Sequence, residues 1–125
     1  MKPKKGFEGI VVYTIERDGC LNGVYSNTGV PKDRLFNEIA RLDRSNTKDK
    51  EPYFNEMNGT PNIVGVYTCS WIDAGNTPVN GTLHITWAGD HYSVVWFNTR
   101  LNRDVFEGTG FLLGNHMFAV HYTYA

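Results

Sequence analysis

The chain has 125 residues and a formal net charge of −1, with 12 basic and 13 acidic side chains. This length predicts one domain, over residues 1–125, that can bury an ordinary core. The near balance of charge gives no support for a nucleic-acid or membrane-surface partner. No apolar run approaches a signal-peptide core or a transmembrane span, so we expect a cytoplasmic protein whose Cys20 and Cys69 are free thiols.

The first predicted hairpin spans Phe7 to Asn27. Arg17-Asp18-Gly19 suits a three-residue loop, which is a type I turn closed by a glycine in the left-handed region. A two-residue loop would mix apolar with polar side chains, whereas this loop gives one face of Val11, Tyr13, Ile15, Leu21, Gly23 and Tyr25. Ahead of the hairpin, the lysines at positions 2, 4 and 5 indicate a flexible, solvated tail over residues 1–6.

Residues 28–61 are expected to be an insertion made of one helix and a long loop. Pro31 suits a helix start, and the stretch from Lys32 to Arg44 carries apolar residues at helical spacing, namely Leu35, Phe36, Ile39, Ala40 and Leu42. We expect this helix to cover the core. The polar stretch from Ser45 to Pro61 predicts a loop of the length seen in lids and in disordered segments.

The clearest hairpin runs from Thr82 to Phe97 around Gly89-Asp90, a two-residue turn with the glycine first that is typical of type II′. This turn pairs Ala88 with His91, Trp87 with Tyr92, Ile85 with Val94 and Leu83 with Trp96. One face then carries the apolar and aromatic residues Leu83, Ile85, Trp87, Tyr92, Val94 and Trp96. Such alternation fixes the register, because a slip of one residue would expose that whole set.

The last hairpin joins Val105–Leu113 to His116–Tyr124 through Gly114-Asn115, which also suits a two-residue turn. This turn would pair Leu112 with Met117, Gly110 with Ala119 and Gly108 with His121. The opposite face would hold Thr109, Phe111, Leu113, Phe118, Val120 and Tyr122. Glycines inside a strand indicate that a large side chain lies over them or that the sheet bends sharply, as in small closed barrels. The sequence leaves open which face points inward.

The second half of the chain resembles small bacterial calycin-like proteins, which are avidin- or lipocalin-like barrels. The residues that carry the likeness are Gly81-Thr-Leu-His-Ile-Thr86, Tyr92-x-x-x-Trp96, Phe106-Glu-Gly-Thr-Gly-Phe111 and Gly114-Asn115-x-x-Phe118-Ala-Val-x-Tyr122. The resemblance implies an all-β antiparallel meander barrel of seven or eight strands, whose interior or one end can hold a small ligand. The family's opening Gly-x-Trp step is replaced by Gly9-Ile10-Val11, and no biotin-site pattern carries over.

Few residues lie in a pattern typical of catalysis or metal binding. The four histidines have no metal-site spacing, and no nucleophile-elbow motif occurs, so we expect no metal, no cofactor and no catalytic residue identifiable from a motif. Only His121 could face inward, beside Gly108, if the glycine face lines the interior. Aromatic walls with a few polar groups are typical of small-molecule sites. The candidate ligand-binding residues are therefore Trp71, Trp87, Tyr92, Trp96, His121 and Tyr122, although the same rings could simply fill a narrow barrel.

Three functions remain open at this point. The first is a non-catalytic binder of a small, partly apolar ligand. The second is an isomerase- or cyclase-type enzyme on the same barrel, with His121 as its acid or base. The third is a structural protein that oligomerises. Whichever face of the last hairpin is inner, apolar residues are left on the outer face, and this predicts a homodimer.

Overall fold

The computed structural model describes residues 6–29, 35–42, 62–73 and 75–125. The described residues form eight strands: β1 (Gly9–Ile15), β2 (Cys20–Asn27), β3 (Phe36–Leu42), β4 (Gly65–Ile72), β5 (Pro78–Trp87), β6 (Tyr92–Asn98), β7 (Arg103–Leu113) and β8 (Met117–Tyr124). The predicted loop at residues 45–61 lies outside the described residues, as does the predicted flexible tail at residues 1–6 apart from Gly6.

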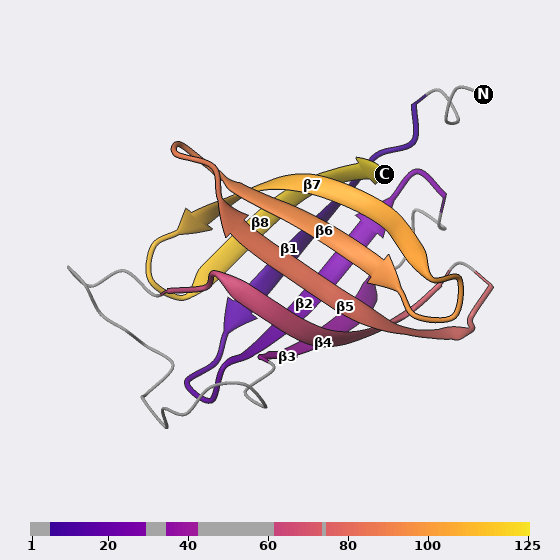
Figure 1. The fold of residues 1–125 in the computed structure, drawn as a ribbon, viewed down its shortest axis with the longest axis horizontal. Helices are drawn as coiled ribbons and strands as arrows, with labels where there is room; N and C mark the ends of the chain where they lie inside the picture. The colour runs from indigo at the N-terminus through magenta and orange to yellow at the C-terminus, as the bar shows by residue number, and fades with distance from the viewer. Residues whose placement is uncertain (1–5, 30–34, 43–61, 74) are drawn as a thin grey trace.

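The strands follow one another around a closed antiparallel barrel, in which β8 pairs with β1 (Figure 1). This confirms the predicted all-β meander barrel and its strand number. Closure leaves no exposed sheet edge, so every strand has two hydrogen-bonded neighbours. In the part of the chain that the structure describes, no helix is long and apolar enough to cross a membrane.

The first two predicted hairpins are confirmed with their registers. In the first, Ile15 pairs with Leu21, and Gly19 closes the three-residue loop with φ at 93°. In the second, Trp87 pairs with Tyr92, and the Ala88 amide donates to the His91 carbonyl at 2.9 Å across the Gly89-Asp90 turn. Both registers turn the predicted apolar faces toward the interior of the barrel.

The helix predicted over residues 32–44 is not observed. Residues 36–42 of this range form β3, which pairs with β2 and β4 and is a full member of the barrel, whereas residues 32–34 and 43–44 lie outside the described residues. The segment therefore cannot be an insertion of helix and loop alone. Its face assignment is unusual, because charged Glu38 points inward and is buried while Ile39 points outward and is 47% exposed.

The last hairpin forms with a register one residue away from the predicted one. Its loop has three residues, Gly114 to His116, so Leu113 pairs with Met117 and Gly108 pairs with Tyr122. One residue of slip exchanges the faces of a strand. Phe118, Val120 and Tyr122 consequently join the glycines on the inner face, and His121 points outward.

The two ends of the barrel differ in how they are filled. At the end that holds the β1–β2, β5–β6 and β7–β8 turns, large and fully buried side chains pack the interior, among them Tyr13, Tyr67, Phe118 and Ile63. Tyr13 and Phe118 stack there with ring centroids 6.1 Å apart. At the opposite end, where β1 begins and β8 finishes, the interior keeps a cavity.

Candidate functional site

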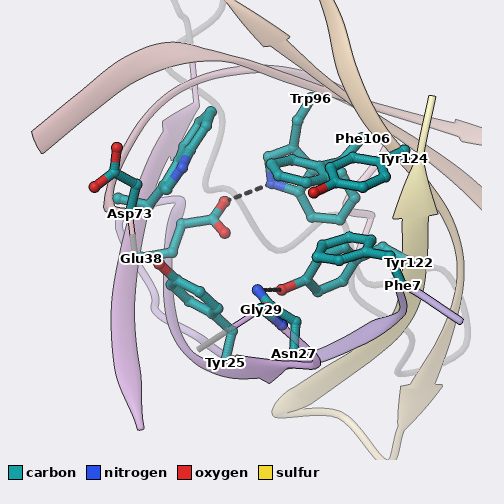
Figure 2. A pocket seen from close by; sticks show the side chains of 11 residues that line it. Phe7, Tyr25, Asn27, Gly29, Glu38, Asp73, Trp96, Phe106, Tyr122 and Tyr124 are labelled. Atoms are coloured by element: carbon teal, nitrogen blue, oxygen red, sulfur yellow. Dashed lines mark hydrogen bonds between the residues drawn. The ribbon is translucent and has the colours of Figure 1, made fainter. Parts of the chain in front are cut away.

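The cavity has a volume of about 220 Å³ and opens at the end of the barrel where β2, β4, β6 and β8 finish. Its walls are mostly aromatic, and the polar groups are few (Figure 2). The lining residues are Phe7, Tyr25, Asn27, Gly29, Glu38, Trp71, Asp73, Trp96, Phe106, Tyr122 and Tyr124. This combination of apolar walls with a few convergent polar groups is typical of small-molecule sites.

Among the buried residues that the structure describes, Glu38 is the only one with a charged side chain, and 4% of its surface is exposed. It lies on β3 between Gly23 of β2 and Trp71 of β4. Two donors converge on its Oε2 atom: the Tyr13 hydroxyl at 2.7 Å and the Trp96 indole N–H at 2.9 Å. These bonds come from β1 and β6, so side chains of different strands hold one carboxyl oxygen in place.

Glycine makes this reach possible. Tyr13 pairs with Gly23, which pairs in turn with Glu38, so the Tyr13 ring must cross over β2 to meet the carboxyl group. A Cβ atom on Gly23 would lie only 2.8 Å from the Tyr13 ring, in space that the ring itself needs. The small residue is therefore required by close approach rather than by an unusual backbone conformation.

The same arrangement recurs at the mouth of the cavity. Tyr122 of β8 lies over Gly9 of β1, and the Tyr122 hydroxyl accepts a hydrogen bond from Asn27 Nδ2 of β2 at 3.0 Å. Figure 2 shows this contact beside the one between Glu38 and Trp96. Because Asn27 is the donor, the Tyr122 hydroxyl still has its own hydrogen to donate. Burial raises the pKa of Tyr122 to about 12, which keeps that hydrogen in place at neutral pH.

Burial also sets the protonation of Glu38. Removal of the carboxyl group from water raises its pKa from an ordinary 4.5 to about 7, although the hydrogen bonds from Tyr13 and Trp96 act in the opposite direction. Near neutral pH the carboxyl group is therefore divided between its neutral and ionised forms. A small change in its surroundings, such as the arrival of a charged group, can shift that balance.

The second carboxyl oxygen, Glu38 Oε1, accepts no hydrogen bond from any described residue, because both bonds to this side chain end on Oε2. Among the described residues, no side-chain nitrogen or oxygen that is fully sealed from solvent lacks a hydrogen-bond partner. Oε1 therefore has access to the cavity. Figure 2 shows the carboxyl group on one side of the cavity, with Phe106 and Tyr122 across from it and the Trp96 indole hydrogen-bonded to it.

The aromatic wall is a connected set of rings. Trp96 lies 5.2 Å from Tyr122 and 6.3 Å from Phe106, and Trp71 lies 6.3 Å from Phe106, between ring centroids. Tyr25 completes the wall, and its hydroxyl donates to the carbonyl oxygen of Ile72. Mutual packing of this kind holds the rings in fixed positions around the Glu38 carboxyl group.

Three of the six candidate residues from the sequence line the cavity: Trp71, Trp96 and Tyr122. The other three do not. Trp87 is 54% exposed and packs against Tyr92, with 4.8 Å between ring centroids, at the opposite end of the barrel. The placement of His121 inside the barrel is wrong, because His121 lies on the outer face with its Nε2 atom 3.7 Å from a Glu8 carboxylate oxygen. Among the described residues, no group of three or more metal-ligating side chains occurs.

Glu38, the central residue of the cavity, was not among the candidates, because it lies in the stretch from Lys32 to Arg44 for which the sequence predicts a helix outside the barrel wall. The available signal was the alternation of Phe36, Glu38, Ala40 and Leu42, which puts a lone carboxylate on an apolar strand face. Asp73 also lines the cavity, and its Oδ1 atom accepts from the amides of Gly75 and Thr77, each at 2.9 Å. Asp73 thus stabilises the turn between β4 and β5.

No protein-family model, no curated protein and no solved structure matches this chain. The calycin-like resemblance therefore stays a prediction, whereas the closed eight-stranded antiparallel barrel that it implied is confirmed.

Proposed function

We propose that this barrel binds a small, partly apolar ligand in the cavity around Glu38 and does not transform it. The observation that carries the proposal is a carboxyl oxygen, Glu38 Oε1, that faces an aromatic cavity and accepts no hydrogen bond from the described residues. Since Oε1 faces the cavity, it can accept a hydrogen bond from a ligand that displaces water there.

The alternative that aromatic side chains simply fill the barrel fits one end and not the other. The end with Tyr13, Tyr67 and Phe118 is filled, and those rings are fully buried. The end with Glu38 keeps about 220 Å³ of space, which is enough for a ligand of roughly one ring with a short arm. The contrast between the two ends supports a binding role for the open one.

A screen of small molecules that includes amines, neutral compounds and acids tests the proposal, with thermal shift as the first measurement and native mass spectrometry as the second. Each hit is then titrated against a matched pair of variants. Trp71→Leu removes a wall of the cavity, and we expect it to weaken binding by about tenfold or more. Trp87→Leu removes a tryptophan at the far end of the barrel and should leave the affinity unchanged.

The proposal fails if the screen yields no hit and protein purified from its natural host carries no small molecule. It also fails if Trp71→Leu and Trp87→Leu weaken every hit equally, because binding would then not depend on the cavity.

An acid–base enzyme of the isomerase or cyclase type is the second candidate, and Glu38 is the observation that favours it. A carboxyl group with a pKa of about 7 and one oxygen facing a cavity has the protonation equilibrium that a general acid or base needs. Glu38 would take the role that the sequence assigned to His121. Turnover of a screened hit that is lost in Glu38→Gln would favour this candidate over a simple binder.

We also propose a homodimer formed through an apolar patch on the outer face of four neighbouring strands. The registers align Phe111 of β7, Ala119 of β8, Val12 of β1 and Val24 of β2 in one row across the barrel. Leu113 and Met117 extend the row on one side, and both are at least 40% exposed. A contiguous apolar surface of this kind is unusual on a monomer, and two-fold pairing of a patch with itself is the commonest way to cover it.

A further inference from the structure

The charges around the cavity have one sign. The lining includes two carboxyl groups, Glu38 and Asp73, and none of the described residues that line it is a lysine, an arginine or a histidine. Arg103 lines an adjoining groove that shares Trp71 and Phe106 with the cavity. Negative charge without a positive partner disfavours an anionic ligand and favours a cation.

The unpaired atom is an acceptor when Glu38 is ionised. Oε1 then needs a donor, and a positively charged N–H group makes the strongest such bond with a carboxylate. A cation also shifts the carboxyl equilibrium toward the ionised form, so ligand and carboxylate stabilise each other. A neutral hydroxyl group would make a weaker bond and would leave the carboxyl group partly protonated near pH 7.

The walls favour the same class of ligand. Aromatic ring faces carry negative electrostatic potential and attract cations within about 6 Å of the ring centre. Phe106 and Tyr122 lie across the cavity from the carboxyl group, and the Trp96 indole, which donates to Glu38 Oε2, lies beside it (Figure 2). These rings would contact the apolar body of a ligand whose cationic nitrogen donates to Oε1.

From these observations we infer that the ligand is a small organic cation, an amine or amidine that bears at least one N–H on a flat apolar body, and that its N–H donates to Glu38 Oε1. This inference rests on the proposed binding function and names the chemical class of its ligand.

Three probes with one body and different charges test it: 2-phenylethylamine, 2-phenylethanol and phenylacetate, titrated by calorimetry at pH 8. We expect the amine to bind about tenfold or more tightly than the alcohol, which is the size of one charge-assisted hydrogen bond. Phenylacetate should bind most weakly. Glu38→Gln should remove the preference for the amine, because the amide keeps an acceptor for Tyr13 and Trp96 but carries no charge. Glu107→Gln, on the exposed outer face of β7, is the matched control and should leave the preference intact.

The pH dependence gives a second readout. The amine should bind more weakly as the pH falls below about 7, since Glu38 is then protonated, and this dependence should vanish in Glu38→Gln. Four other titratable groups lie near the carboxyl group: Tyr13 on β1, Tyr25 on β2, Cys69 on β4 and Tyr122 on β8. Burial raises the pKa of each, so all four stay neutral between pH 5 and pH 8. The Asp73 carboxylate, at the end of β4, is held in its turn by two backbone amides.

Equal or tighter binding of the alcohol or of phenylacetate overturns the inference and leaves the proposed function standing. Survival of the amine preference in Glu38→Gln overturns it as well. If none of the three probes binds, the hits of the wider screen decide: cationic hits that depend on Glu38 support the inference, and hits of any other charge class overturn it. A screen without any hit counts against the proposed function itself.

Discussion

The Glu38 carboxyl group makes the stability of this barrel depend on pH. In the folded protein its pKa is about 7, whereas its ordinary value is 4.5. Below pH 4.5 the group is protonated in both states and costs nothing. Between pH 4.5 and 7 the unfolded chain releases the proton while the folded chain retains it, so the free energy of unfolding falls. Above pH 7 the free energy of unfolding has fallen by its full amount, which is on the order of 3 kcal/mol.

Glu38→Gln should remove this loss, because glutamine does not titrate. We expect the variant to gain stability relative to the wild-type protein as the pH rises from 4.5 to 8, by on the order of 3 kcal/mol. Urea denaturation at several pH values measures the difference, with Glu107→Gln as the exposed control. A difference between Glu38→Gln and wild type that does not change with pH would mean that Glu38 titrates in its ordinary range.

At the scale of the strand, the inner-face glycines of β7 are required by the space around them. A Cβ atom on Gly108 would lie 2.6 Å from the His121 carbonyl oxygen and 2.7 Å from Val120 Cγ1. Gly108→Val should therefore overpack the barrel and destabilise it by about 1–3 kcal/mol. Thr109→Val is the matched control, because Thr109 points outward and valine suits an exposed strand position. Urea melts compare the two variants, and a stabilised Gly108→Val protein would contradict this packing.

The sequence predicts a hairpin correctly where the turn type and the alternation of apolar residues indicate the same register. The Gly89-Asp90 turn and the Arg17-Asp18-Gly19 loop each allow one register that gathers the apolar residues on one face. In the last hairpin two loop lengths are compatible with the sequence around Gly114. The three-residue loop forms in the structure, and this difference of one residue places Phe118 and Tyr122, rather than His121, on the inner face.

Strand β3 could not be predicted from local sequence, because its residues suit both periods. Leu35, Ile39 and Leu42 share one side of a helix, whereas a strand places Glu38 inward and Ile39 outward, against their hydrophobicity. Pairing with β2 and β4 decides the outcome, and such pairing is a long-range property. For the same reason, only part of the site could be predicted. Trp71, Trp96 and Tyr122 are aromatic residues that indicate a cavity wall, whereas Glu38 faces the cavity only because β3 pairs into the closed barrel.

For the whole molecule, the outer patch that includes Phe111 and Met117 predicts self-association at micromolar concentration. The net charge of −1 provides little repulsion against it. Phe111→Gln should raise the dissociation constant of the dimer by about tenfold or more. Leu101→Gln is the matched control, since Leu101 is 51% exposed and Phe111 54%, but Leu101 lies in the β6–β7 loop away from the patch. Sedimentation velocity measures both variants, and a wild-type protein that stays monomeric at high micromolar concentration would contradict the proposed dimer.

Binding of a ligand in the cavity around Glu38 can be tested by NMR through the indole N–H signals of the three tryptophans. Trp71 and Trp96 line the cavity, and the Trp96 indole is hydrogen-bonded to Glu38. Trp87, at the opposite end of the barrel, is an internal reference. On titration with 2-phenylethylamine or a screen hit, we expect the signals of Trp71 and Trp96 to move and that of Trp87 to stay. A bound compound that moves Trp87 and leaves Trp71 and Trp96 unchanged would contradict binding in this cavity.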